Sequence, residues 1–198
     1  MDRPLGPVLD SIVRHVEELI VVRGSAGVWN RWEAMARAKC DVIFTCDDDA
    51  VVDVPAVLAA YDPSIVTCNM PDAVRPGYRD GIALVGWGAV FSQKRVYPIG
   101  YRLEDGTVPA FVRYKAWCTE QHQPFLDAVF RRECDRVFTG LSPLKLIDVP
   151  IQHMPWADGE DRMCRFAHDP VHAESMREIR RRIYAIREQQ NRPHLPGA

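Results

Sequence analysis

The sequence predicts a single α/β domain with a mostly parallel central sheet. Short apolar runs rich in β-branched residues alternate with segments whose apolar residues recur at helical spacing. This alternation, with short turns between the segments, is typical of parallel sheets covered by helices. With 198 residues, of which 47% are hydrophobic and 26% charged, the chain suits one domain, residues 1–198, with a sizeable core.

Helical and extended patterns alternate in the first half of the chain. Val8, Ile12 and Val16 recur at helical spacing, whereas residues 19–22 form a short β-branched run that a glycine-rich turn ends. Pro55 falls in the first turn of a later helical pattern, where proline is tolerated. The expected elements are helices over 5–17, 29–39 and 54–61 and strands over 19–22, 42–44 and 65–68.

The second half is less regular. An apolar run over 82–85 leads into Gly86-Trp87-Gly88, where we expect either a backbone that a ligand approaches closely beside an aromatic wall, or a tight packing turn. The other expected elements are a loop over 71–81, a hairpin turn at 103–107, helical segments over 125–141 with a break near 133–135, a strand over 146–151, a polar loop over 155–172 and a terminal docking helix over 171–190.

Three adjacent carboxylates end a buried strand. Asp47, Asp48 and Asp49 follow the apolar run 42–44, at the sheet edge where parallel α/β sheets bind ligands. Their repulsion and lost hydration require a nearby cation, and a hard divalent ion is the simplest candidate. Because alternate side chains of an extended segment share a face, Asp47 and Asp49 can reach one ion while Asp48 points elsewhere. The alternative is a solvated acidic turn.

Composition narrows the function classes. The net charge of −2 argues against broad non-specific binding of nucleic acid, although a local basic patch is compatible with it. The apolar runs fall far short of the ~18 residues that span a bilayer. No apolar core follows a basic start as in a signal peptide, so we expect no membrane partner and a cytoplasmic protein. The six cysteines lack C-x-x-C spacing, which favours reduced thiols; they are Cys40, Cys46, Cys68, Cys118, Cys134 and Cys164.

The order of these features resembles the GT-A glycosyltransferases, which transfer sugars from nucleotide donors on a Rossmann-like fold, and more narrowly their compact phage-type members. The similarity extends from Arg3 to about His172. The D-x-D element alone is a weak signal, whereas the ordered set is more specific. The matching parts are Arg3-Pro4, residues 19–22, Asp47-Asp48-Asp49, Gly86-Trp87-Gly88, Asp135 at an acidic helix start and His153 after a strand.

The resemblance implies a metal-dependent transferase. Asp47 and Asp49 would hold Mn²⁺ or Mg²⁺, with His153 completing its coordination, and the ion would bridge the phosphates of a nucleoside-diphosphate sugar. Asp135 would remove the proton of the acceptor hydroxyl, and an acidic base suits inversion of configuration. The rival base is Asp161, which belongs to a family-like Glu-Asp pair. For Asp135 and His153 the ordinary alternatives are a helix N-cap and a hydrogen-bonded surface histidine.

The donor would be held by residues spread along the chain. Arg23 and Gly24 lie at the expected ligand edge of the sheet, and the polar loop 155–172 resembles a lid whose arginines can pair with phosphate oxygens. A solvated charged loop is the alternative to a lid. The expected donor-binding residues are Arg23, Gly24, Asp48, Gly86, Trp87, Gly88, Trp156, Arg162 and Arg165.

The sequence departs from the family in two places. Family members carry a strand before the Arg-Pro element that forms part of the nucleoside pocket, and we expect the sheet here to lack it. In the family the base follows a glutamate, whereas here Cys134 precedes Asp135.

Acceptor and function class stay open at this point. The phage-type resemblance suggests a hydroxylated pyrimidine in DNA, with phosphate contacts from Arg75, Arg79 and an arginine cluster in the terminal helix. One competing interpretation is a nucleotidyltransferase, which would need a glycine-rich basic phosphate loop that is not visible. Another is a non-catalytic module that binds nucleotide sugar or DNA. A zinc pair at His168 and His172 is disfavoured because Pro170 lies between them.

Overall fold

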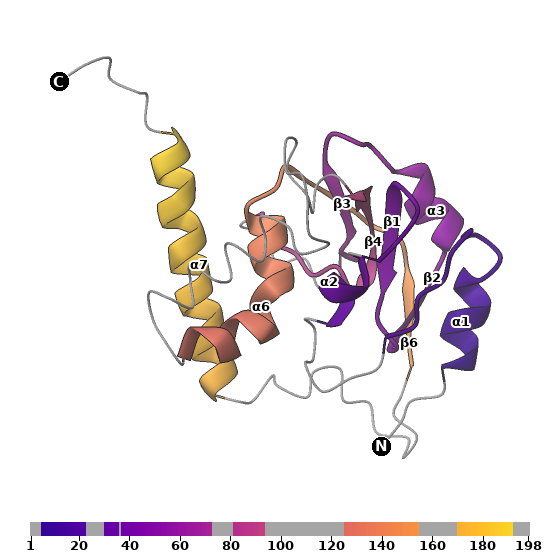
Figure 1. Cartoon of the computed structure of the whole chain (residues 1–198), viewed down its shortest axis with the longest axis horizontal. Coiled ribbons are helices and arrows are strands. Elements are labelled where there is room, and N and C mark those ends of the chain that lie inside the picture. The colour runs from indigo at the N-terminus through magenta and orange to yellow at the C-terminus, as the bar shows by residue number, and fades with distance from the viewer. Residues whose placement is uncertain are drawn as a thin grey trace.

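The computed structural model describes residues 5–22, 30–35, 37–72, 81–93, 125–154 and 170–191, without the side chains of 33, 125–132, 170–172, 175, 186 and 189–191. It has mixed α/β architecture (Figure 1), so the predicted class is confirmed. The helices are α1 (Gly6–Ile12), α2 (Asn30–Met35), α3 (Val54–Ala59), α6 (Phe125–Gly140) and α7 (Pro170–Asn191). The strands are β1 (Val42–Cys46), β2 (Ala50–Val52), β3 (Val66–Asn69), β4 (Trp87–Ser92), β5 (Leu144–Ile147) and β6 (Ile151–His153).

The main sheet is mixed rather than parallel. Its four described strands lie in the order β1-β4-β3-β5. β4 is antiparallel to both of its neighbours, and β3 pairs with β5 in parallel. It follows that β1, β3 and β5 share one direction and that β4 runs against them. The mostly parallel Rossmann-like sheet expected from the sequence is therefore not confirmed.

A second, two-stranded sheet lies next to the acidic triplet. β2 begins immediately after the triplet and pairs in antiparallel fashion with β6, with Ala50 opposite His153 and Val52 opposite Ile151. The backbone N–H of Met154 donates to the carbonyl of Asp49 at 2.8 Å. This pairing brings the strand that ends in His153 alongside the turn that carries the triplet.

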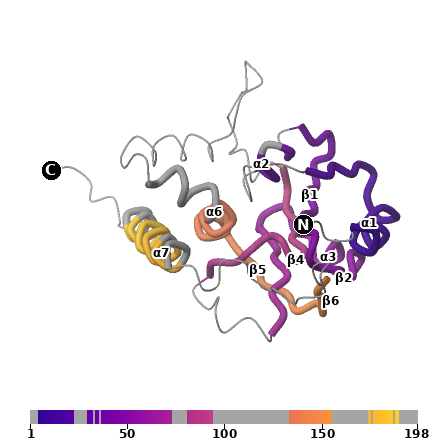
Figure 2. Tube along the Cα trace, turned by 90° about the horizontal axis from the view of Figure 1, so that it is seen from below, coloured from indigo at the N-terminus to yellow at the C-terminus, as the bar shows by residue number. Residues whose placement is uncertain are grey.

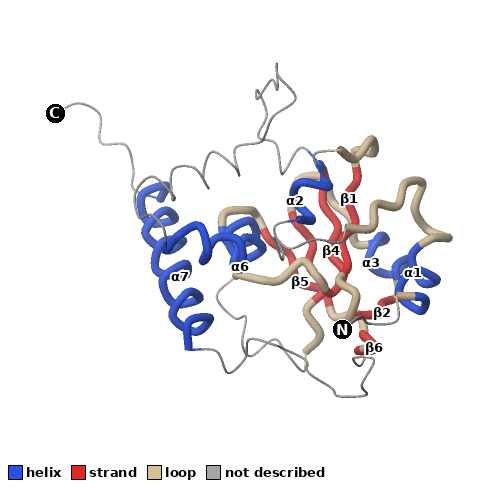
Figure 3. The backbone as a smooth tube through the Cα atoms, turned by 60° about the horizontal axis from the view of Figure 1, so that its bottom comes forward, coloured by secondary structure: helices blue, strands red, loops and turns tan. Residues whose placement is uncertain are grey.

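Helices cover both faces of the main sheet, and each face has its own core (Figures 2 and 3). On one face, Val8 of α1 and Val57 of α3 pack against Val90 of β4. On the other, Trp32 of α2 and Phe138 of α6 lie with ring centroids 4.8 Å apart. α7 packs on the outer side of α6. The helices α2 and α6, which both contribute to the candidate site, thus belong to the same layer.

Local sequence signals explain where the short helix α3 begins. Asp53 is its N-cap, and its carboxylate accepts the N–H of Ala56 at 3.1 Å, which satisfies one of the donors that a helix start leaves free. Pro55 stands in the first turn, as the sequence predicted, because its missing N–H is not needed there.

Three elements differ from the sequence prediction. The single strand expected over 146–151 is wrong, because β5 ends at Ile147, residues 148–150 form no regular element and β6 begins at Ile151 in the other sheet. The strand expected over 19–22 is wrong, since these residues form no regular element and their four apolar side chains are 41–50% exposed. The break expected near 133–135 is also wrong, because α6 continues unbroken to Gly140. Asp135 is consequently not a helix N-cap but an interior helical residue.

Two further observations come from the described residues. Among the described residues, no helix combines the length and the apolar character needed to cross a membrane. The described cysteines are free, and they are Cys40, Cys46, Cys68 and Cys134.

Candidate active site

The acidic triplet forms a tight turn between β1 and β2. The N–H of Asp47 donates to the carbonyl of Gly86 at 2.6 Å, and the thiol of Cys46 donates to the carbonyl of Ala50 at 3.1 Å, across the turn. Asp48 is exposed, whereas Asp47 and Asp49 are half-buried. The middle carboxylate is thus more exposed than the outer two, and the triplet lies in a turn rather than in the extended segment that the alternation argument assumed.

Glycines shape the strand that faces this turn. The register between β1 and β4 shifts after Thr45, so that Cys46 lies opposite Trp87 and Gly88 is the extra residue of a bulge. Gly88 has φ +93°, a conformation that glycine adopts without strain. Two residues earlier, a Cβ on Gly86 would lie 1.9 Å from Oδ2 of Asp47. Thus the space beside Gly86 holds the carboxylate of Asp47.

Arg31 of α2 joins two carboxylates that are far apart in the sequence. Its Nη2 forms a short ion pair with Oδ1 of Asp47, and its Nη1 lies 3.3 Å from Oδ2 of Asp135. The arginine side chain is 16% exposed and that of Asp135 only 5%, whereas Asp47 keeps 39% of its side-chain surface. The three side chains form a cluster of one cationic and two acidic groups, which is buried at Arg31 and Asp135 and open to solvent at Asp47.

Asp135 reaches this cluster from the middle of α6. Its carboxylate accepts the backbone N–H of Val85, and the hydroxyl of Thr45 donates to the carbonyl of the same residue at 2.6 Å. Val85 is fully buried between β1 and α6. The segment before β4 therefore holds the end of β1 and the interior of α6 in a fixed relation.

Burial and charge set the protonation tendencies of the cluster. Burial raises the pKa of the Asp135 carboxyl above its ordinary value, and the Arg31 charge opposes that rise. Burial alone would lower the pKa of Arg31, but Asp135 and Asp47 outweigh it and the pKa is raised. Burial, with Asp47 and Asp49, raises the pKa of Cys46 to about 12. Cys134 is raised well above its ordinary pKa by burial and by Asp135, so neither thiol is suited to act as a nucleophile.

The donors expected for a divalent ion lie on adjoining elements. Asp47 and Asp49 are in the turn, and His153 lies opposite Ala50 with its ring 5.5 Å from that of Trp87, edge to face. Within the described ranges no three histidine, cysteine or acidic side chains converge as an all-protein metal cage. Mg²⁺, however, is bound by one or two carboxylates together with waters and substrate phosphates. The exposed edge of Asp47 and the neighbouring Asp49 fit that mode.

Several expected site residues are placed, and others lie outside the description. The structure brings Asp47, Gly86 and Asp135 together and sets His153 beside the triplet turn. Trp87, the first residue of β4, is 8% exposed and belongs to the core, so most of its side chain is covered by protein. The expected site residues outside the described ranges are Arg23, Gly24, Trp156, Asp161, Arg162 and Arg165. Arg75, Arg79 and most of the expected lid loop also lie outside them.

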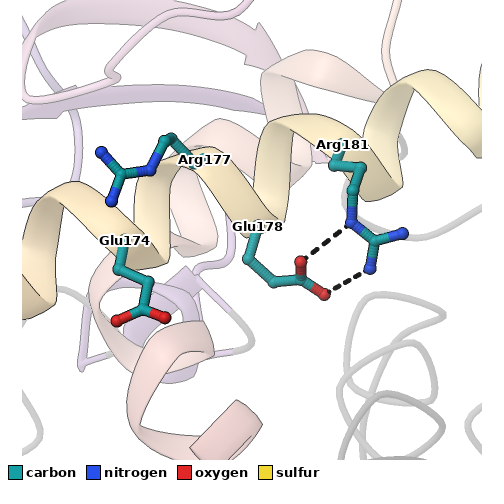
Figure 4. A pocket seen from close by; sticks show the side chains of 4 residues that line it. All are labelled: Glu174, Arg177, Glu178 and Arg181. Atoms are coloured by element: carbon teal, nitrogen blue, oxygen red, sulfur yellow. Dashed lines mark hydrogen bonds and ion pairs between the residues drawn. The ribbon is translucent and has the colours of Figure 1, made fainter.

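A shallow hollow on α7 is unrelated to this cluster. It measures about 300 Å³ and is lined by Glu174, Arg177, Glu178 and Arg181 (Figure 4). The carboxylate of Glu178 accepts both Nε and Nη2 of Arg181, at 3.0 and 2.8 Å, and Nε of Arg182 at 2.7 Å. These contacts between residues three and four apart are those of a solvated helix face.

Sequence reasoning missed Arg31. It stands between Asn30 and the core residue Trp32, in a helix recognised only by its apolar stripe. The signal that could have found it is the demand for a cation made by the triplet, applied to the helix that directly precedes the acidic strand. The sequence analysis assigned the required positive charge to a bound divalent ion instead.

The chain was compared with models of protein families, with curated proteins and with solved structures, and nothing matches it in any of the three. The interpretation of the site consequently depends on its own geometry.

Proposed function

We propose that this chain is a metal-dependent glycosyltransferase that moves a sugar from a nucleoside-diphosphate sugar to an acceptor hydroxyl. The observation that carries the proposal is the meeting of Asp47 and Asp135 at the guanidinium of Arg31. A transfer of this kind needs one acidic group to hold an ion and another to accept a proton, close together but distinct. The parts of the GT-A resemblance that the structure brings together, the acidic triplet and Gly86, support the same assignment.

The two carboxylates have different environments, which suits different roles. Asp47 is partly exposed and has the carboxylates of Asp48 and Asp49 beside it in one turn, an arrangement that attracts a hard divalent ion. When bound, Mn²⁺ or Mg²⁺ would neutralise the charge that develops on the leaving diphosphate.

Asp135 is the proposed general base. Its pKa is raised by burial, which makes the ionised carboxylate a stronger proton acceptor, while Arg31 at 3.3 Å favours that ionised form. The N–H of Val85 holds the carboxylate in one orientation. Attack by the deprotonated hydroxyl on the anomeric carbon, from the side opposite the diphosphate, would invert the configuration.

For the acceptor we propose a hydroxylated pyrimidine in DNA. The support is the phage-type resemblance and the arginine-rich terminal helix α7, in which Arg177 and Arg181 are exposed. Because Arg181 and Arg182 are bound to Glu178, only part of this charge is free to meet phosphates. Binding to duplex DNA with and without the modified base, at low salt where phosphate contacts are strongest, tests the acceptor separately from the transfer.

The test of the central proposal is a thermal-shift screen followed by a transfer assay. UDP-, GDP-, ADP- and TDP-sugars are screened with and without Mn²⁺, because a donor at 100 times its Kd stabilises the folded state by about 2.7 kcal/mol. The donor that raises Tm is then assayed for metal-dependent release of nucleoside diphosphate. Asp41→Asn is the matched control, since this exposed carboxylate lies next to the other end of β1. Absence of any metal-dependent shift or release would refute the assignment.

A non-catalytic nucleotide-sugar binding module is the second candidate. The observation that favours it is that Arg31 already neutralises Asp47, which lessens the need for an ion there. A donor-dependent thermal shift without release of nucleoside diphosphate, with or without an acceptor, would support this candidate over the enzyme.

A further inference from the structure

Arg31 has a geometry that a simple structural ion pair does not require. A single carboxylate would satisfy its charge, yet its two terminal nitrogens contact different carboxylates on different elements. The Asp135 arm is buried, whereas the Asp47 arm lies at the edge where that carboxylate keeps 39% of its surface. One arm is therefore fixed in the interior and the other is accessible to a competing cation.

The charges around Asp47 make such competition unavoidable. Arg31 offsets one of the two carboxylates that it contacts, and Asp48 and Asp49 add two more anions in the same turn. Arg136, the cation that follows Asp135 in α6, is bound to the buried Glu133. A divalent ion in this turn would draw on the charge of Asp47, the same carboxylate that Arg31 pairs with through Oδ1.

We propose that Arg31 is an internal counter-cation that competes with the divalent ion for Asp47 and so sets the ion concentration at which the site is loaded. The proposal depends on the ion site of the proposed function. Arg31 is a positioning residue in this scheme. Its arm on Asp135 persists in either state, because that contact is buried and does not involve the turn.

Truncating Arg31 alone would leave Asp135 buried without its cation, which costs several kcal/mol in typical proteins and could unfold the chain. The test therefore compares Asp135→Asn with the double variant Arg31→Gln/Asp135→Asn. In the first variant Arg31 still holds Asp47; in the second neither the cation nor the buried anion remains. Arg31→Lys retains the charge but has no fork that can reach both carboxylates.

The readout is the Kd of Mn²⁺ for the full-length protein, measured by electron paramagnetic resonance of the free ion without any sugar nucleotide. We expect the double variant to bind Mn²⁺ roughly tenfold more tightly than Asp135→Asn, a change equal to about 1.4 kcal/mol. Arg31→Lys is expected to bind more tightly than wild type. The control Arg37→Gln removes an equal charge from the exposed end of the same helical segment and should change Kd by less than about twofold.

Equal or weaker binding by the double variant than by Asp135→Asn would overturn the proposal, and so would an equal gain in Arg37→Gln, which would indicate only a general charge effect. Failure of the proposed function is distinguishable. A tenfold gain in Mn²⁺ affinity with no sugar transfer by wild type would sustain the role of Arg31 and refute the transferase. Sugar transfer by wild type with no gain in the double variant would do the reverse.

Discussion

At the scale of single residues, the carboxylate of Asp47 depends on the absence of a side chain at position 86. A Cβ there would lie 1.9 Å from Oδ2 and 2.5 Å from Cγ of Asp47. Neither atom can remain in place, because real Cβ contacts are never so short and the N–H of Asp47 is tied to the Gly86 carbonyl at 2.6 Å. Gly86 is thus required by the site's own carboxylate, whatever ligand approaches it.

Gly86→Ala is therefore expected to displace the Asp47 carboxylate. The overpacking should lower the free energy of unfolding by about 1–3 kcal/mol, and the affinity for Mn²⁺ should fall with it. The control is Gly6→Ala in the first turn of α1, where nothing lies within 4 Å of the added methyl group. Urea unfolding and Mn²⁺ titration check both effects, and an alanine at 86 that preserves stability and ion affinity would contradict them.

Asp135 makes stability depend on pH in a defined direction. Its pKa is raised in the folded protein, so the folded state keeps the proton at pH values where the unfolded chain has lost it. The stability that wild type draws from this group is largest below the ordinary pKa of 3.8 and declines as pH rises through the raised folded value. The decline amounts to about 1.4 kcal/mol for each unit by which folding raises the pKa.

Asp135→Asn removes that titration. Its free energy of unfolding, relative to wild type, is expected to increase as pH rises through the same window and to be constant above it. Urea unfolding of both proteins between pH 3.5 and 8 measures the difference. A difference that is independent of pH, or that decreases with rising pH, would show that the folded pKa of Asp135 is not raised.

Sequence reasoning anticipated part of this cluster. It required a cation beside the triplet because adjacent carboxylates at a strand end cannot be buried alone, and it named Asp47 and Asp135. It did not apply that requirement to Arg31 in the preceding helix, and it could not pair the two acids, because their contact with Arg31 depends on how α2 and α6 pack on one face of the sheet. No local pattern encodes that packing.

At the scale of elements, the packing of α7 on α6 centres on a glycine. Gly140 ends α6, and a Cβ there would lie 2.8 Å from Cδ1 and 3.0 Å from Cγ2 of the fully buried Ile183. Arg187 braces the same junction, donating from Nε to the Gly140 carbonyl at 2.7 Å and from Nη2 to the Gly81 carbonyl at 2.9 Å. The terminal helix is thus docked by close approach as well as by its apolar stripe.

We expect Gly140→Ala to destabilise the protein by about 1–3 kcal/mol through this overlap, despite the better helix propensity of alanine. Ile183→Val alone should cost about 0.5–1.5 kcal/mol. In the Gly140→Ala background it should cost less or nothing, because it removes the Cδ1 methyl group that is overlapped most. A double-mutant cycle by urea unfolding measures the coupling, and simple additivity of the two substitutions would contradict the packing.

The elements that the sequence identified wrongly share a cause. Residues 19–22 have the composition of a buried strand but are 41–50% exposed, and propensity cannot report burial. The break expected near 133–135 likewise depended on local composition, whereas α6 continues unbroken to Gly140. In contrast, β1 and α3 follow the prediction, because a run bounded by polar residues and an Asp-capped start with proline are local signals.

At the scale of the whole molecule, the antiparallel strand β4 is what the alternation of helices and strands failed to predict. A parallel neighbour requires a crossover, usually a helix, whereas an antiparallel one can follow a loop. The segment between β3 and β4 shows polar turn residues and no helical periodicity in the sequence. The missing helical periodicity favours antiparallel pairing. The prediction followed the regular alternation of the preceding segments instead.

The mixed sheet has a consequence for the site. Because β4 runs against β1, its first residues lie beside the last residues of β1, so that Gly86 and Trp87 meet the acidic turn. The chain direction of β4 therefore joins two motifs that the sequence separates by almost forty residues. α6 then brings Asp135 to the same place from the second half of the chain.

This assembly from distant segments predicts that the acids fail in different ways. Asp49→Asn keeps the shape of the turn but weakens its hold on an ion, so the defect should appear as reduced affinity for Mn²⁺ and donor, partly recovered by excess Mn²⁺. Asp135→Asn should leave donor affinity near normal and reduce turnover by about 10²–10⁴-fold, the usual contribution of a general base. Donor titration and single-turnover kinetics separate the two defects, with Asp41→Asn as the control.

The rival base Asp161 lies outside the described residues, and the same measurements decide between the two acids. If Asp135 is the base, Asp161→Asn should retain turnover within about tenfold, and Asp135→Asn should lose the acidic limb of the pH–rate profile along with its rate. The limb belongs to the base because the rate falls as the base becomes protonated. Loss of turnover in Asp161→Asn, with full activity and normal donor affinity in Asp135→Asn, would assign the role of general base to Asp161 in the loop over 155–172. Asp135 would then serve only to hold Arg31, and the inward arm of that arginine would be purely structural.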